Sequence, residues 1–277
     1  MKKQYKAVFS AAAIAAAAVI TACACLLSVR GITAPASLLT LPAVTASDLF
    51  PSYAERCGLW FDSAINPDVT FDFVKSEVSE ETSQNIRNAA GNIAESVLQP
   101  TLEALGLSMG GFDLSDYTEL LVMRSKSAGT GFKLLHCHCH AFTKLKGAYW
   151  EFGISLMLDY NTLQPYVITL DDPYKKITDY SSVIRHSLAA FANALGDEQA
   201  RLSDHRDIPE VLNQKADFRL PVCAGVVTPK HYSLSLLACK SIYLENRTVY
   251  LLVYSNKPVS SISLCALSPE QMELLTK

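Results

Sequence analysis

GFKLLHCHCHAF at Gly131–Phe142 is followed, after a short link, by AYWEFGISLMLD at Ala148–Asp159. Polar and apolar residues alternate in both segments. Successive side chains of a β-strand point to opposite faces of a sheet, so the two segments predict a β-hairpin with one buried and one exposed face. Strand-like runs also precede and follow this hairpin, at Tyr117–Ser125 and Pro165–Leu170. Together the four runs predict an antiparallel meander.

The apolar residues of the second segment fix the expected register of the hairpin. We expect Cys139 opposite Phe152 and Cys137 opposite Ile154, which places both cysteines in the core. The last histidine of the run then lies opposite Glu151. A shift of one residue would bury the histidines instead, at roughly 1–3 kcal/mol for each unpaired polar group.

The exposed face of the hairpin carries a candidate metal site. His-x-His on a strand is a workable ligand spacing, and a glutamate across the hairpin supplies an oxygen ligand. The predicted ligands of zinc or copper are His136, His138, His140 and Glu151. An ordinary solvated sheet face would show the same alternation, so both interpretations stay open.

Helices with one apolar face are predicted at Glu80–Leu105, Tyr180–Leu195 and Ile208–Ala216. A capped helix from Ser268 ends the chain. Between the last two helices lies a second set of strands: Arg219–Val227, Tyr232–Tyr243, Thr248–Ser255 and Val259–Ala266. Strands gathered in meanders favour an α+β fold over a doubly wound parallel sheet. The domain divides into two halves, about 47–175 and 176–277, each with one or more predicted helices and four predicted strands. The halves are either the products of a duplication or parts of one continuous sheet.

The N-terminus carries an export signal. Basic residues Lys2, Lys3 and Lys6 precede an uncharged apolar run, Ala7–Val29, which ends at Arg30. Such a run is long enough to cross the ~30 Å hydrocarbon core, which needs about 20 residues. The charge bias places the N-terminus in the cytoplasm. We therefore predict a signal anchor at residues 1–30, a linker at 31–46 and an extracytoplasmic domain at 47–277.

Two other fates of this segment remain open, cleavage at Ala22-Cys23-Ala24 and lipidation at Cys23 within Ile20-Thr21-Ala22-Cys23. The alanine-rich segment with its short basic start is typical of bacteria. The predicted location is therefore the bacterial cell membrane, crossed once, with the C-terminal domain outside.

Charge and cysteine content limit the functions of this domain. Without the four basic residues of the first 30, the 24 Lys and Arg fall to 20, against 27 Asp and Glu, a net charge of −7. This balance offers no footprint for nucleic acid. Six of the eight cysteines lie in the domain, but Cys137 and Cys139, two apart on one strand, are too far apart to bond to each other. The disulfide state of the six stays open.

Gly106–Gly110 matches the G-x-S-x-G pattern of the α/β-hydrolase nucleophile elbow, with Asp171, Asp172, His205 and His231 downstream. The elbow joins a strand to a following helix. Here a predicted helix precedes Gly106 and a strand follows, so we interpret the match as a helix end and a turn.

The sequence therefore favours a non-catalytic binding or accessory domain over an enzyme. Its predicted partners are the membrane, through the N-terminal helix, and another membrane or envelope protein. The alternative function is a metal-binding protein that uses the histidine strand.

Overall fold

The computed structural model describes residues 52–65, 69–73, 80–104, 111–113, 118–125, 131–145, 148–171, 180–196, 201–222, 225–227, 233–257 and 261–277. All of them lie within Thr45–Lys277, which forms one structural unit. The predicted signal anchor and linker lie outside the described residues. The boundaries of these segments therefore stay predictions.

The described helices and strands alternate in groups. The helices are α3 (Tyr53–Ile65), α4 (Glu80–Ala104), α5 (Tyr180–Ala194), α6 (Asp207–Asn213) and α7 (Pro269–Thr276). The strands are β1 (Val69–Phe73), β2 (Gly111–Asp113), β3 (Thr118–Ser125), β4 (Gly131–Leu145), β5 (Ala148–Asp159), β6 (Pro165–Asp171), β7 (Ser203–Asp204), β8 (Leu220–Val222), β9 (Gly225–Val227), β10 (Ser233–Leu244), β11 (Arg247–Lys257) and β12 (Ser261–Leu267). The predicted α+β class is confirmed.

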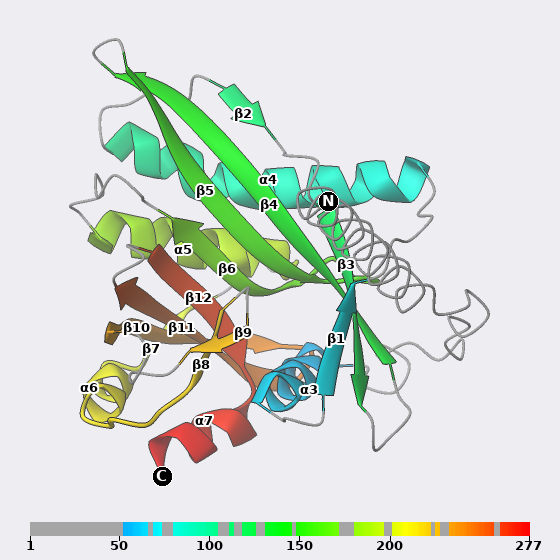
Figure 1. Ribbon diagram of the computed structural model, residues 1–277. Coiled ribbons are helices and arrows are strands. Elements are labelled where there is room, and N and C mark those ends of the chain that lie inside the picture. Colours follow the sequence, from blue (N-terminus) through cyan, green and yellow to red (C-terminus); the bar gives the residue numbers. More distant parts are fainter. Residues whose placement is uncertain are drawn as a thin grey trace, which may run out of the picture. The chain divides into compact units, whose positions relative to one another are not determined.

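A ten-stranded antiparallel sheet unites the described strands other than β8 and β9 (Figure 1). Its order is β1-β3-β4-β5-β6-β12-β11-β10-β7, and β2 pairs with β4. The predicted meander is β3–β6, and β10–β12 form a second one. The two meanders join where β6 pairs with β12, for example Ile168 with Leu264. One continuous sheet therefore runs through both halves.

Helices cover the sheet in two groups. The long helices α4 and α5 pack side by side, α4 against β4 and α5 against β6 (Figure 1). Helices α3 and α7 pack together and contact β12 and β11. The capping box predicted for the last helix is present, because Ser268 Oγ accepts from the Gln271 backbone and the Gln271 side chain accepts from Ser268 N–H.

The predicted register of the β4–β5 hairpin is wrong by two residues. Cys139 pairs with Ile154 and Cys137 with Leu156. Strand β4 continues to Leu145, beyond the predicted end at Phe142, and this extension shifts the pairing. Because side chains alternate with a period of two, an even shift keeps every residue on its face. Both cysteines are fully buried, as predicted.

The predicted strand Arg219–Val227 is also wrong, since β8 and β9 form a separate two-stranded sheet. Leu220 pairs with Val227 and Val222 with Gly225. Proline has no N–H to donate to a central ladder, so Pro221 disfavours a place inside the main sheet. The Pro221 carbonyl accepts a hydrogen bond from the Tyr254 hydroxyl on β11. This contact holds the small hairpin against β11.

Helix α3 is missing from the sequence prediction although its signals are present. Ser52 Oγ accepts from Glu55 N–H and Glu55 Oε2 accepts from Ser52 N–H, both at 3.2 Å, which is a capping box. Tyr53, Cys57 and Trp60, at i, i+4 and i+7, are all buried. The helix therefore follows the ordinary rules for an amphipathic helix.

Two turns of the sheet hold α3 in place. At the β10–β11 turn, Glu245 and Asn246 have φ of 51° and 65°, as in a type I′ hairpin. Glu245 accepts from Tyr53 N–H, and Arg247 pairs with Glu55 at 3.0 Å. These contacts hold the start of α3 against the β10–β11 turn.

At the β5–β6 turn, Arg56 Nε lies 3.6 Å from Asp159 Oδ2, and both side chains are at most 3% exposed. Asp159 also accepts from the Tyr166 hydroxyl at 2.8 Å and from two turn N–H groups at 2.9 Å, those of Asn161 and Thr162. The carboxylate thus connects α3, the turn and β6.

Candidate functional site

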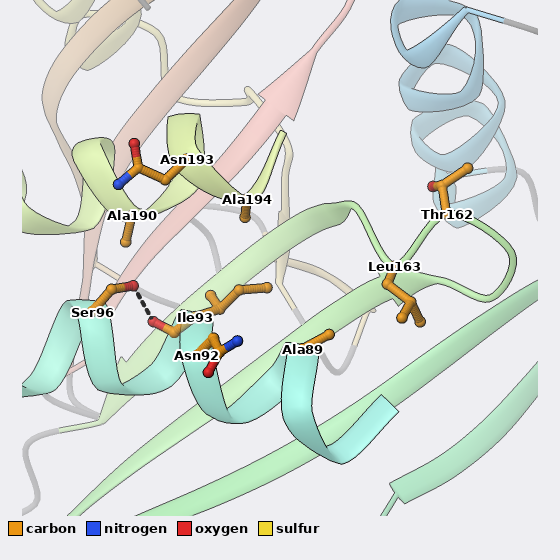
Figure 2. A pocket seen from close by; sticks show the side chains of 9 residues that line it. All are labelled: Ala89, Asn92, Ile93, Ser96, Thr162, Leu163, Ala190, Asn193 and Ala194. Atoms are coloured by element: carbon orange, nitrogen blue, oxygen red, sulfur yellow. Dashed lines mark hydrogen bonds between the residues drawn. The ribbon is translucent and has the colours of Figure 1, made fainter. Parts of the chain in front are cut away.

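A groove of about 530 Å³ lies between α4, α5 and the β5–β6 turn, and Figure 2 shows its lining. Ligand pockets commonly have volumes of roughly 300–1,000 Å³. The lining residues are Ala89, Asn92, Ile93 and Ser96 from α4, Ala190, Asn193 and Ala194 from α5, and Thr162 and Leu163 from the turn. The alanines leave room between the two helices.

The polar atoms of this groove belong to amides and hydroxyls. Asn92 and Asn193 are exposed, one on each helix. Ser96 Oγ donates to Ile93 O at 2.8 Å (Figure 2), and Thr162 Oγ1 accepts from Gln164 N–H at 3.4 Å. Among the described residues that line the groove, none has an acidic, basic or thiol side chain. The groove is therefore suited to hydrogen bonding and van der Waals contact.

Leu163 closes one end of the groove in an unusual backbone conformation. Its φ is 58°, in the left-handed region that non-glycine residues enter at a cost of roughly 1–2 kcal/mol. Its N–H donates to Asp159 O at 2.9 Å, and its side chain packs against the core. The strained turn thus presents an apolar side chain at the groove.

The structure brings the predicted metal ligands together in pairs. The rings of His136 and His138 are 4.2 Å apart. His138 Nδ1 lies 2.9 Å from Ser155 Oγ, and His140 Nδ1 lies 2.5 Å from Glu151 Oε1. The three histidines are half-buried, which corrects the prediction of an exposed face. Among the residues that the structure describes, no three His, Cys, Asp or Glu side chains form a group able to hold a metal ion.

Glu151 reaches His140 diagonally across the hairpin. The residue directly opposite His140 is Gly153, not Glu151 as predicted. Diagonal neighbours of a pair are within reach of long side chains.

Polar residues continue from the histidines across the centre of the sheet. One row in register is His138, Ser155, Thr169, Ser263 and Tyr254. Thr169 Oγ1 and Ser263 Oγ lie 2.9 Å apart. All members of the row except the histidine are buried. The sheet face with the histidines is therefore polar well into the interior.

The next row contains Asn256, which the sequence analysis did not single out, and Asp171, which it named only among the possible partners of the hydrolase-like serine. His140, Gly153, Asp171, Ser261 and Asn256 pair in succession across five strands. Burial raises the pKa of Asp171, and the nearby His140 opposes this change. Asn256 Oδ1 is buried and has no hydrogen-bond partner among the residues that the structure describes. Only the strand register, which the sequence does not reveal, brings these residues together.

The five described cysteines, Cys57, Cys137, Cys139, Cys239 and Cys265, are all buried. Burial raises the pKa of Cys139 and of Cys239 to about 12. Cys239 and Cys265 are each in register with Leu252, so they lie two strands apart, at roughly 9–10 Å between Cα atoms. A disulfide requires less than about 7 Å. Because the thiolate is the nucleophile, Cys139 and Cys239 are poor candidates for catalysis.

Several predicted features lie outside the described residues. They include the hydrolase-like Ser108 and its possible partners Asp172 and His231, together with Cys223 and the apolar run Ala7–Val29. None of the helices in the described ranges is long and apolar enough to cross a membrane.

The sequence matches no protein-family model, no curated protein and no solved structure.

Proposed function

We propose that the chain is a membrane-anchored, extracytoplasmic, non-catalytic binding or accessory domain of a bacterial cell, which binds a membrane or envelope protein through the groove between α4 and α5. The apolar N-terminal run supports the anchor and the orientation. The observation that carries the binding role is the chemistry of the groove, whose described lining consists of alanines, two larger aliphatic side chains, amides and hydroxyls. Such a lining forms hydrogen bonds and close contacts, whereas catalysis needs groups that transfer protons or electrons.

The hydrogen-bonded turn at one end of the groove also supports binding. Both helices present small side chains, and the turn that closes the groove is fixed by the buried Asp159 carboxylate. A preformed surface loses little conformational entropy when a partner docks.

Crosslinking in intact cells tests this proposal. A photo-crosslinking residue in place of the exposed Asn193 should capture one envelope protein. Ala89→Trp, which fills the groove, should reduce this product at least about fivefold because it removes the space between the helices. A crosslinker at Leu274, 70% exposed on α7, is the matched control and should not give the product. Equal capture from Leu274, or capture that Ala89→Trp leaves unchanged, would contradict the proposal.

Metal binding by the histidine strand is a second proposal, favoured by the contact between His140 and Glu151. Zinc and copper both accept imidazole nitrogen and carboxylate oxygen. His138 would have to bind through Nε2, because its Nδ1 is engaged with Ser155 Oγ. Elemental analysis of the purified chain separates the two proposals.

A further inference from the structure

We propose that the sheet face around Gly153 and Asp171 is a second binding site, for a ligand that carries a protonated alkylamine. The site lies along β5 and β6, away from the turn that closes the groove, and does not depend on the groove. Its residues are His140, Gly153, Asp171, Ser261 and Asn256, with Glu151 beside them.

The solvent exposure of the side chains falls along this row, from His140 to Asn256. The side chains of His140 and Glu151 are 35% and 45% exposed. Gly153 and Asp171 are half-buried, whereas Ser261 and Asn256 are 3% and 6% exposed. A ligand would therefore enter from the histidine side and reach inward over Gly153.

Gly153 leaves space between His140 and Asp171. A Cβ atom added at Gly153 would lie 3.7 Å from Asp171 Cβ and 3.8 Å from Asp171 Oδ2. These are ordinary van der Waals distances, so alanine fits here without a clash. The same distances show that the Asp171 side chain lines the space over the glycine.

Two hydrogen-bond acceptors for which the described residues supply no donor lie farther along this row, on either side of Ser261. Within the described part of the chain, no hydrogen bond to the Asp171 carboxyl is found, and Asn256 Oδ1 is buried with no partner. A buried polar group left without a partner destabilises the folded state. The Asp171 carboxyl and Asn256 Oδ1, which lie on the same face of the sheet, are thus complementary to a group that donates hydrogen bonds.

The negative charge of the two carboxyl groups at this site favours a hydrogen-bond donor that is positively charged. Asp171 and Glu151 both carry carboxyls, so an anionic ligand would be repelled. Asp171 and Asn256 lie on either side of Ser261, two strands apart, or roughly 9–10 Å between Cα atoms. One ammonium group between them has three N–H donors and can satisfy both acceptors. The proposed ligand group is an alkylammonium. A free amine and a lysine side chain both carry this group.

Ligand-detected NMR titrations of the full chain in detergent, with chelator present, test this site. The probes are butylamine, Nα-acetyl-lysine methylamide and, as a neutral match, butanol. We expect saturable binding of at least one amine and none of butanol. Binding of butanol as tight as that of the amines, or no binding of either amine, would overturn the proposal. So would amine binding that appears only when the chelator is replaced by zinc or copper.

Three variants locate the site. Asp171→Asn, which keeps the size of the side chain but removes the charge and replaces one acceptor oxygen by an NH2 donor, should weaken amine binding at least tenfold. Gly153→Ala should weaken it similarly by filling the space. Asp204→Asn, the same change on the exposed strand β7 at the edge of the sheet, is the matched control and should bind as the parent does. Because the described residues supply no donor to Asp171, Asp171→Asn should not lower the melting temperature. Amine affinity unchanged by Asp171→Asn and Gly153→Ala would overturn the proposal.

Discussion

Asp159→Ala should lower the free energy of unfolding by about 3–5 kcal/mol, because it leaves the buried guanidinium of Arg56 without its counter-charge. The variant also removes the acceptor of the Tyr166 hydroxyl and of two turn N–H groups. Denaturant unfolding followed by circular dichroism measures the loss.

The controls for Asp159→Ala separate buried from exposed charge pairs. Arg56→Met combined with Asp159→Leu should cost less than the sum of the single losses, since it removes both charges together. Asp204→Ala disrupts the exposed pair with Arg206 and should leave stability unchanged within error. A loss from Asp159→Ala no larger than that from Asp204→Ala would show that α3 is not held by this ion pair.

Cys139→Asp should destabilise the fold by at least about 3 kcal/mol, because it places a carboxylate at a fully buried position opposite Ile154. Cys139→Ala, which removes the thiol without adding charge, should cost less. His138→Ala should cost about 1 kcal/mol, the value of its hydrogen bond to Ser155. Thermal melts in the presence of chelator compare the three variants. A larger loss from His138→Ala than from Cys139→Asp would contradict the assignment of the two sheet faces.

Local patterns predicted much of the fold. The period of two in β4 and β5 identifies both strands and the buried face, and the apolar stripe of α4 locates that helix within a residue at its C-terminal end. The capping box at Ser268 likewise marks the start of α7. Each of these signals is contained within a few turns of helix or one strand.

Features that depend on distant partners could not be predicted in this way. Arg56 and Asp159 are both charged and would be expected at the surface, and only their mutual contact explains their burial. The strand β8 pairs with β9 rather than with the main sheet, which strand propensity alone does not reveal. To predict the register of β4 and β5 correctly, one would have to know that β4 ends at Leu145.

The candidate sites were harder to predict than the fold. The histidine strand was found because its ligand-type residues are consecutive in the sequence. The groove requires α4, the β5–β6 turn and α5 to meet, and its lining of small residues has no motif. Asp171 and Asn256 are brought onto one row by two strand pairings, both through Ser261.

The burial of the cysteines makes a direct test of membrane topology feasible. In the described part of the chain, the cysteines are buried, and burial raises the pKa of Cys139 and of Cys239, so little reaction with maleimide is expected from them. Leu274→Cys places a thiol at a position that is 70% exposed. The parent chain measures the background from all other cysteines.

The decisive measurement is labelling of Leu274→Cys in intact spheroplasts with a membrane-impermeant maleimide, followed by carbonate extraction of the membranes. An anchored extracytoplasmic domain predicts labelling well above that of the parent, with the labelled chain retained in the membrane pellet. Labelling that occurs only after the cells are lysed would contradict the proposed location, and a labelled chain released into the medium would contradict the anchor.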